Sequence, residues 1–305
     1  MKKIHSTAII SPEVIMGENV EIGPYSVIEG NVKIGDNCKI GPHVHICGYT
    51  EIGENCRIFK GAVVGSIPQD LKYKGKKTFL KIGNNNIIRE FVTINPGTFE
   101  GEYTIIGNNN LLMAYSHIAH NCIIGNNVII ANSGTLAGHV VVDDYAIIGG
   151  IVGIHQFCKI GKHSIIGGCS KVTKDIVPFI MANGQPAKPY GLNKVGLKRR
   201  NFSKEKIELL EKAYKIIFRS GLNVSEAISE LEKLESDTTV YKFIGAILAQ
   251  VDKNKLVEEL RDKKETLEMQ IKVVQRQEER TRNQLKELRN KIQQALAKRG
   301  SEVAE

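Results

Sequence analysis

An aliphatic residue recurs at every sixth position over most of the chain up to Val172. The run begins at Ile4 and continues to Val64, and the same register resumes at Ile82 and again at Ile106. An amphipathic helix has a period of 3.6 residues and a simple strand has a period of two, so neither explains a period of six. A parallel β-helix built from six-residue repeats does explain it.

Two other places of the repeat support this interpretation. The fifth place carries small or β-branched residues such as Val20, Ser26 and Cys38, as a narrow interior requires. Glycine commonly follows the aliphatic residue, and we expect it to supply a positive φ angle at a corner. Three repeats would complete one turn, so that residues 18 apart stack on strands about 4.8 Å apart. Spacing alone does not give the hand of the coil, and parallel crossovers in general are right-handed.

Two polar stretches interrupt the repeat without shifting its register. They run from Ser66 to Lys81 and from Asn95 to Thr104, and both contain glycine and proline. We interpret them as loops inserted at corners of the coil. Insertions in a rigid repeat are usual places for binding residues.

The repeat ends after about Val172, and helical patterns follow a connector that contains three prolines. Ser203 is a candidate N-cap for the first helix. From Val257 an interrupted heptad pattern favours a coiled coil. We therefore predict a mainly β protein with three parts. These are a parallel β-helix of hexapeptide repeats over residues 1–190, a C-terminal α-helical domain over 191–255 and a helical, coiled-coil-like extension over 256–305.

Composition and charge narrow the class of protein. Of the 305 residues, 42% are hydrophobic, and the formal charge is +9. No stretch is long and apolar enough for a signal peptide or a membrane span, so we expect a cytoplasmic protein. The positive charge favours a phosphate-bearing substrate or an acidic carrier protein. Few aromatic residues and no Trp disfavour nucleic-acid binding by base stacking. The six cysteines contain no CxxC pair, and we interpret them as small buried residues.

Four histidines cluster within the repeat, at positions 117, 120, 139 and 155. Gly138 and Gln156 follow His120 by one and two turns of the coil, so the pairs Gly138–His139 and His155–Gln156 would stack above His120 on one corner. A lone polar residue at an outward place is most simply a solvated one. A cluster of this kind favours a functional site.

Two kinds of chemistry fit clustered histidines. Imidazoles from adjacent turns or subunits can bind Zn²⁺, but the chain has no HxxxxH pair and no carboxylate beside the cluster in sequence, so we predict no metal. A general base fits better, because a neutral imidazole suits the deprotonation of a hydroxyl that attacks a thioester. Gly138 would allow its backbone N–H to point at a developing oxyanion.

Six motifs resemble those of one family, the UDP-N-acetylglucosamine O-acyltransferases that begin lipid A biosynthesis. In chain order they are QDLKY (69–73), IRE-VTIN-GT (88–98), NNLLM-SHIAH-C (109–122), TLAGHV-VDD-AIIGG (135–150), HQFC-IG (155–161) and GLKRR-FS (196–203). The resemblance implies a left-handed parallel β-helix and a homotrimer with active sites between subunits. It also implies transfer of a 3-hydroxyacyl group from the phosphopantetheine of acyl carrier protein to the glucosamine 3-position of the UDP-sugar, with no bound cofactor.

The resemblance assigns roles to individual positions. His120 resembles the general base, and His139 with the Gly138 N–H resembles the stabilisers of the thioester oxyanion. Three groups of binding residues follow: Asp70, Lys72 and Gln156 for the sugar nucleotide, His117 and His155 lining the site, and Asn193, Arg199 and Arg200 for the nucleotide phosphates or the phosphopantetheine. Gly168 matches a position that limits acyl length, and its lack of a side chain favours a groove open to a longer chain. The plain alternatives are a basic helix start at 198–200 and a solvated loop pair at 70 and 72.

Two departures from the family pattern qualify these expectations. Asn121 stands where the family usually has an aspartate directly after the catalytic histidine, and an amide stabilises an imidazolium less than a carboxylate does. At Asn95–Pro96 the family often carries a basic residue, so the alternative acceptor is a UDP-sugar with a 3-amino group. A non-catalytic trimeric β-helix scaffold is the alternative from another class, and the concentration of His, Asp, Lys and Arg argues against it. Acyl chain length does not follow from the sequence.

Overall fold

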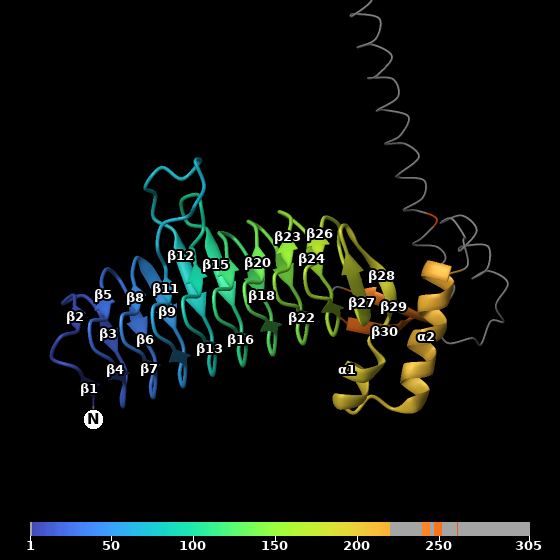
Figure 1. Ribbon diagram of the computed structural model, residues 1–305, viewed down its shortest axis with the longest axis horizontal. Coiled ribbons are helices and arrows are strands. Elements are labelled where there is room, and N and C mark those ends of the chain that lie inside the picture. Colours follow the sequence, from blue (N-terminus) through green and yellow to red (C-terminus); the bar gives the residue numbers. More distant parts are fainter. Residues whose placement is uncertain (1, 220–239, 245–246, 252–260, 262–305) are drawn as a thin grey trace, which may run out of the picture. The chain divides into compact units, whose positions relative to one another are not determined.

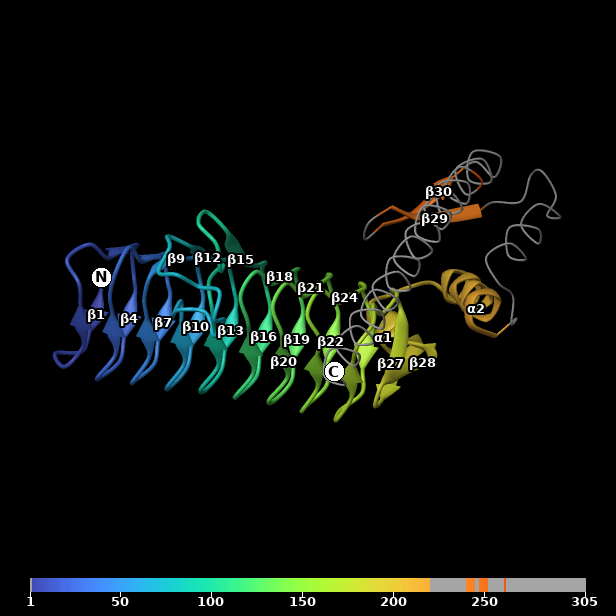
Figure 2. The same cartoon turned by 90° about the horizontal axis from the view of Figure 1, so that it is seen from above.

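The computed structural model describes residues 2–219, 240–244, 247–251 and 261. It divides into two compact units, Met1–Gly221 and Leu222–Glu305. In the first unit, short strands form three parallel sheets that run along a coil (Figure 1). Each turn of the coil contributes one strand to each sheet. Successive strands of the first sheet, from β1 (Lys3–Ile4) to β27 (Ile180–Gly184), lie side by side along the coil (Figure 2). The mainly β architecture predicted from the six-residue period is confirmed.

The strands of the coil have the following bounds. The first sheet contains β1 (Lys3–Ile4), β4 (Glu21–Ile22), β7 (Lys39–Ile40), β10 (Arg57–Ile58), β13 (Ile87–Ile88), β16 (Leu111–Leu112), β19 (Ile129–Ile130), β22 (Ile147–Ile148), β25 (Ile165–Ile166), β27 (Ile180–Gly184) and β28 (Ala187–Leu192). The second contains β2 (Ile9–Ile10), β5 (Val27–Ile28), β8 (His45–Ile46), β11 (Val63–Val64), β14 (Thr93–Ile94), β17 (His117–Ile118), β20 (Thr135–Leu136), β23 (Gly153–Ile154) and β26 (Lys171–Val172). The third contains β3 (Ile15–Met16), β6 (Lys33–Ile34), β9 (Tyr49–Ile52), β12 (Phe79–Ile82), β15 (Tyr103–Ile106), β18 (Ile123–Ile124), β21 (Val141–Val142) and β24 (Lys159–Ile160).

The interior of the coil is the predicted column of aliphatic side chains. Ile28, Ile46, Ile88 and Ile118 are among those with no exposed surface, and the small fifth-place residues are buried beside them. Regular turns pair residues 18 apart, such as Ile4 with Ile22. The prediction for the cysteines is only partly correct, because Cys169 is exposed at a corner and Cys47 is half-buried.

The corners differ from the prediction in where the backbone is left-handed. The positive φ angle falls three places after the aliphatic residue, on residues such as Asn19 (54°) and Asn37 (57°), and asparagine tolerates this conformation better than most residues do. The glycine directly after the aliphatic residue serves close packing instead. A Cβ on Gly23 would lie 2.8 Å from the backbone of Gly41 in the next turn. The prediction therefore identified a corner but gave the wrong reason for its glycine.

The two inserted loops are shorter than predicted, because β12 and β15 are four-residue strands that begin before the repeat register resumes. Phe79 pairs with Tyr103, and their rings stack at a centroid distance of 4.7 Å. The loops therefore comprise residues 65–78 and 95–102. Both connect the second sheet to the third, and they project from the same side of the coil (Figure 1).

A hairpin and two helices close the C-terminal end of the coil. Strand β27 pairs with β25 and with the antiparallel strand β28. Helix α1 (Lys194–Arg199) follows, and helix α2 (Lys204–Arg219) begins after Ser203, whose Oγ accepts from the N–H of Lys206 as an N-cap does. Helix α2 contacts β28, and Tyr214 belongs to the core of the coil. The first compact unit thus extends to residue 221 and includes the hairpin and both helices.

One segment of the predicted helical domain is a β-hairpin. Strands β29 (Val240–Ile244) and β30 (Ile247–Val251) pair antiparallel, because both segments are rich in the β-branched and aromatic residues that favour strands. The predicted coiled-coil-like extension lies outside the described residues apart from Arg261. Within the part of the chain that the structure describes, no helix is long and apolar enough to cross a bilayer.

His163 lies in a column of stacked rings near the C-terminal end of the coil. Its ring stacks on Tyr145 at 4.7 Å and on Phe179 at 5.6 Å. Burial lowers the pKa of His163 to about 4, with further contributions from the charges of Lys162 and Arg200 and an opposing one from Asp144. The unfolded chain therefore takes up a proton near pH ~6.5, before the folded chain does. The contribution of this neutral ring to stability is present above that pH and is lost as the pH falls toward 4.

We expect His163→Phe to reduce the acid sensitivity of the fold. Phenylalanine keeps the stacking but binds no proton, so the loss of unfolding free energy between about pH 6.5 and pH 4 should shrink by on the order of 3 kcal/mol. Denaturant unfolding at fixed protein concentration across this range measures it. His43→Phe is the control, because His43 also stacks on a tyrosine but is exposed. An unchanged pH dependence in His163→Phe would refute the assignment.

Candidate active site

The predicted histidine cluster lies at the corner between the second and third sheets. The five successive strands β11, β14, β17, β20 and β23 are neighbours in the second sheet, and the chain leaves each of them at this corner. The first two connections are the inserted loops 65–78 and 95–102, and the next three carry His120, Gly138–His139 and His155–Gln156. Residues far apart in sequence therefore meet at one corner.

The stacking predicted for this corner is confirmed. The N–H of His139 donates to the carbonyl oxygen of His120 at 3.0 Å, and the N–H of Phe157 donates to that of Gly138 at 3.2 Å. The His120 and His139 rings meet edge-on with centroids 5.2 Å apart, and His139 stacks on Phe157 at 4.7 Å. The rings of His120, His139 and Phe157 thus form a row of contacts across three turns.

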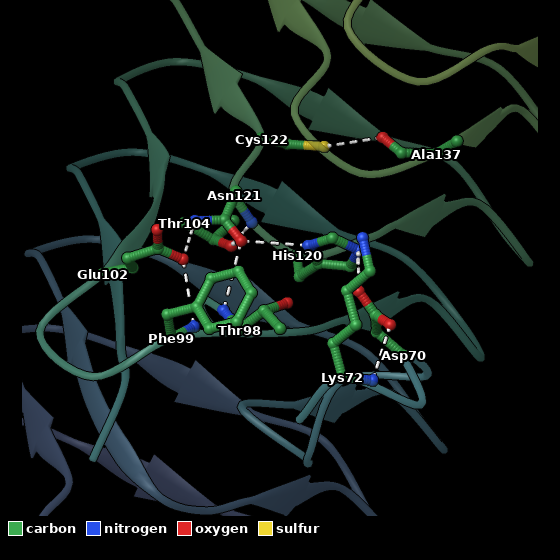
Figure 3. Close-up of polar contacts among 10 residues, drawn as sticks. All are labelled: Asp70, Lys72, Thr98, Phe99, Glu102, Thr104, His120, Asn121, Cys122 and Ala137. Atoms are coloured by element: carbon green, nitrogen blue, oxygen red, sulfur yellow. Dashed lines mark hydrogen bonds and ion pairs between the residues drawn. The ribbon is translucent and has the colours of Figure 1, made fainter. Parts of the chain in front are cut away.

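His120 is held on both sides and is only 6% exposed. Its Nδ1 lies 2.9 Å from Oδ1 of Asn121, and its Nε2 lies 3.4 Å from Oδ2 of Asp70, which comes from loop 65–78 (Figure 3). The ring fills the space above Gly138, where any Cβ would overlap it. No carboxylate adjoins the histidines in sequence. In space the inserted loop brings Asp70 to them, as its assignment to the sugar-nucleotide site implied.

Asn121 is the centre of a hydrogen-bond network at this corner. It has a φ angle of 60°, and its N–H donates to Oγ1 of Thr104 at 2.8 Å. Its Oδ1 also accepts from the N–H of Thr98 at 3.1 Å, and its Nδ2 donates to Oε2 of Glu102 at 2.7 Å (Figure 3). Sequence reasoning did not single out Thr98, Thr104 or Glu102. Thr98 ends the motif IRE-VTIN-GT but had no predicted role, and the only signal for Thr104 and Glu102 was the inserted loop itself.

Burial and hydrogen bonds together set the charge states around His120. Burial lowers the pKa of His117 and of His139, and the neighbouring charge of His120 lowers both further. His117 also lies 2.7 Å from Oγ1 of Thr93 through its Nδ1. Burial alone would raise the pKa of Glu102, but hydrogen bonds from the Phe99 N–H and the Asn121 side chain outweigh it and lower that pKa. The site therefore favours neutral rings at His117 and His139 and an ionised carboxylate at Glu102.

The loop of Asp70 presents a cation beside the histidines. Oδ1 of Asp70 accepts from the N–H of Lys72 at 2.9 Å, which fixes the turn and the direction of the carboxylate. Lys72 is exposed, and its charge contributes to the lowered pKa of His139. His155 and Gln156 are exposed on the turn two beyond His120, with His155 Nδ1 3.2 Å from the Gln156 carbonyl oxygen.

The remaining predicted site residues lie on other corners. Asn193 is the N-cap of α1, and its side chain accepts from the Gly196 N–H and donates to the carbonyl oxygen of His163. Arg199 ends that helix, and the guanidinium of Arg200 lies 4.6 Å from the centre of the Tyr145 ring, at the corner between the third and first sheets. Gly168 is exposed at the corner between the first and second sheets, where a Cβ would meet the carbonyl oxygen of Gly150 at 3.3 Å. A single chain does not bring them to His120.

Comparison with known proteins gives the class first. The profile of bacterial transferase hexapeptide repeats matches residues 13–48, 31–66 and 103–138, and that of domain 2 of UDP-N-acetylglucosamine O-acyltransferase matches 175–301. The acyl-[acyl-carrier-protein]–UDP-N-acetylglucosamine O-acyltransferase of Thiobacillus denitrificans is 50% identical over 232 residues, which cover 76% of this chain and 90% of the relative. That of Herminiimonas arsenicoxydans is 49% identical over 245 residues, covering 79% and 94%.

Solved structures agree with this result. LpxA from Acinetobacter baumannii has 48% sequence identity and a TM-score of 0.71 over 75% of this chain and 90% of that one. LpxA from Bacteroides fragilis has 48% identity and a TM-score of 0.72 over 75% and 89%. The chain belongs to the family of acyl-[acyl-carrier-protein]–UDP-N-acetylglucosamine O-acyltransferases, and the resemblance predicted from its motifs is confirmed.

Proposed function

We propose that this UDP-N-acetylglucosamine O-acyltransferase uses His120 as the general base of the first step of lipid A biosynthesis. The reaction moves a 3-hydroxyacyl chain from acyl carrier protein to the 3-position of the glucosamine. One observation carries the proposal: a buried imidazole has Nδ1 held by Asn121 and Nε2 directed at the loop that carries Asp70. Its second nitrogen is thus directed to where an acceptor hydroxyl would have to lie.

The chemistry follows from that placement. Nε2 takes the proton of the 3-hydroxyl while the oxygen attacks the carbonyl carbon of the acyl thioester. The resulting tetrahedral oxyanion collapses with cleavage of the C–S bond, and the imidazolium returns its proton to the departing sulfur of the carrier. The products are the 3-O-acyl sugar nucleotide and the free carrier thiol, so no other reactant is needed.

His139 and Gly138 are the groups we assign to the oxyanion. The His139 ring meets His120 edge-on, and burial keeps it neutral by lowering its pKa, so it offers an N–H without adding a full charge. The Gly138 backbone N–H belongs to the turn directly above His120. Donors fixed in a partly buried site stabilise an oxyanion more than water does.

The sugar nucleotide binds along the same corner in this proposal. Asp70 and Gln156 offer hydrogen bonds to the sugar, and Lys72 offers a cation to the diphosphate. The turns that carry His120, Gly138–His139 and His155–Gln156 form a histidine ladder. His117 lies on its first turn and His155 on its last. Asp70 is close enough to Nε2 for an acceptor hydroxyl to take its place beside the imidazole.

We further propose a homotrimer of left-handed coils in the cytoplasm. Gly168, Asn193, Arg199 and Arg200 lie on corners away from His120, so only a neighbouring subunit can bring such residues to this site. The outward places of the first sheet form an apolar stripe that favours such packing. Its members are Ile87, Leu111, Ile129, Ile147 and Ile165, all half-buried in the single chain. Arg199 and Arg200 then meet the phosphopantetheine or nucleotide phosphates.

The test is acyl transfer by the native protein from 3-hydroxyacyl carrier proteins of several chain lengths to UDP-N-acetylglucosamine. Mass spectrometry follows the product, and base lability distinguishes an ester from an amide. The 3-amino analogue of the acceptor and acyl coenzyme A as donor are assayed in parallel. The proposal predicts an ester on UDP-N-acetylglucosamine. Transfer to the 3-amino analogue alone would overturn the acceptor, and transfer to neither would favour the scaffold alternative.

A further inference from the structure

A second carboxylate lies on the far side of Asn121 from His120. Oε2 of Glu102 accepts from Nδ2 of Asn121 at 2.7 Å, while Oδ1 of the same amide lies 2.9 Å from Nδ1 of His120 (Figure 3). Glu102 is the last residue of loop 95–102, directly before β15. A chain of hydrogen bonds therefore joins the imidazole to a carboxylate that the sequence does not place near it.

The neighbours of Asn121 fix the direction of its amide. The backbone N–H of Thr98, 3.1 Å from Oδ1, can only donate, and the ionised carboxylate of Glu102 can only accept. Rotating the amide by half a turn would place two donors against each other at Thr98 and two acceptors against each other at Glu102. Oδ1 must therefore face His120, where it accepts, so in the neutral imidazole the proton lies on Nδ1, and Nε2, 3.4 Å from Oδ2 of Asp70, carries none.

We propose that Glu102 is a positioning residue for acyl transfer, which acts through the Asn121 amide to hold His120 with Nε2 as the basic nitrogen. The inference deepens the proposed function and rests on it. It also accounts for Asn121 at a position where an aspartate was expected. Here the carboxylate lies one side chain further from the imidazole. It acts on the ring by fixing the orientation of the Asn121 amide. Glu102 touches neither the acceptor nor the thioester in this scheme.

Glu102 has a second contact that a test must separate from this role. The same Oε2 accepts from the N–H of Phe99 at 3.0 Å, which ties loop 95–102 to itself. A residue that only anchored the loop would affect substrate binding, and therefore KM. A residue that orients the base affects kcat.

The first experiment compares Glu102→Ala with Glu102→Gln in the full chain. Alanine frees the Asn121 amide, and we expect kcat to fall by about 10- to 100-fold with little change in either KM. Glutamine keeps an oxygen that accepts from Asn121 and Phe99, so its kcat should stay within about threefold of native. Glu100→Ala is the matched control, because Glu100 lies in the same loop but pairs with Lys76 at 3.5 Å on the surface.

The second experiment asks whether a direct carboxylate replaces the relay. Asn121→Asp sets two carboxylates against each other where the amide now donates to Glu102, so we expect kcat to fall about tenfold. The double variant Asn121→Asp/Glu102→Ala removes that repulsion, because no second carboxylate remains and the new aspartate can hold Nδ1 of His120 directly. We expect it to recover kcat to within about threefold of native.

Three results would overturn the inference. The first is a Glu102→Ala variant as active as Glu100→Ala. The second is a Glu102→Ala effect confined to KM. The third is a double variant no more active than Asn121→Asp, whether that single variant is impaired or active. Failure of the native protein to transfer acyl groups in the same assay is a separate outcome. It would remove the proposed function itself, whereas the variants are compared only against an active native enzyme.

Discussion

His120→Ala should lower kcat for acyl transfer by about 10³-fold while leaving the KM for the sugar nucleotide close to native. The reason is that the imidazole acts on the 3-hydroxyl only as the bond to the acyl carbon forms. The substrate contacts assigned to Asp70, Lys72 and Gln156 do not depend on that ring. Steady-state kinetics with saturating 3-hydroxyacyl carrier protein measures both constants.

The matched control for this variant is His45→Ala. His45 is an outward residue of β8, a strand of the second sheet, whose strand β17 precedes His120. Its Nε2 lies 3.0 Å from a carboxylate oxygen of Glu29. It thus resembles His120 in having an acidic partner but lies several turns away. We expect native kcat from it. A His120→Ala variant that retained more than about a tenth of native kcat would exclude His120 as the principal base.

Gly138→Ala should produce the second largest loss, about 100-fold in kcat. The variant keeps the backbone N–H assigned to the oxyanion and adds only a methyl group. That methyl would occupy the space that the His120 ring now fills, so the ring must move. Displacement of a base from its acceptor by a fraction of an ångström is enough to lower the rate of proton transfer. The variant therefore tests the position of the His120 ring, because every group assigned to catalysis is still present.

Gly150→Ala is the control for Gly138→Ala, because it adds the same methyl group where no side chain is displaced. Gly150 occupies the same place in its hexad, two residues after a buried aliphatic residue, at a different corner. A Cβ there would meet only the carbonyl oxygen of Asn132 at 3.4 Å, an ordinary contact. We expect near-native kcat from Gly150→Ala. Equal losses in both variants would indicate general damage to the coil and would argue against a specific role for Gly138.

The coil was predictable because every turn obeys the same local rule. One aliphatic residue in six sufficed to place Ile118 above Leu136 and Ile154, and with them the histidine ladder. The corners were less predictable. The sequence does not reveal whether a glycine is needed for close packing or for a positive φ angle. The structure shows that Gly23 is needed for close packing and that the residue with the positive φ angle is Asn19.

The polar partners of the histidines do not follow from the repeat, for a different reason. Asp70 and Glu102 lie in inserted loops whose paths no repeat constrains. The insertions lengthen the turns on either side of Ile82, which pairs with Ile52 before it and with Ile106 after it, so neither pair keeps the regular spacing. The resemblance to the acyltransferase family supplied Asp70, because the motif QDLKY carries it. It could not supply Glu102, whose role depends on the amide of Asn121.

The measurement that tests the account most directly is a neutron crystal structure of the deuterated protein at about pH 8, where a free histidine is neutral. The account predicts deuterium on Nδ1 of His120, pointing at Oδ1 of Asn121, and a bare Nε2 facing the acceptor. Deuterium on Nε2, with or without a second one on Nδ1, would contradict it, because that nitrogen could not then accept the proton of the 3-hydroxyl.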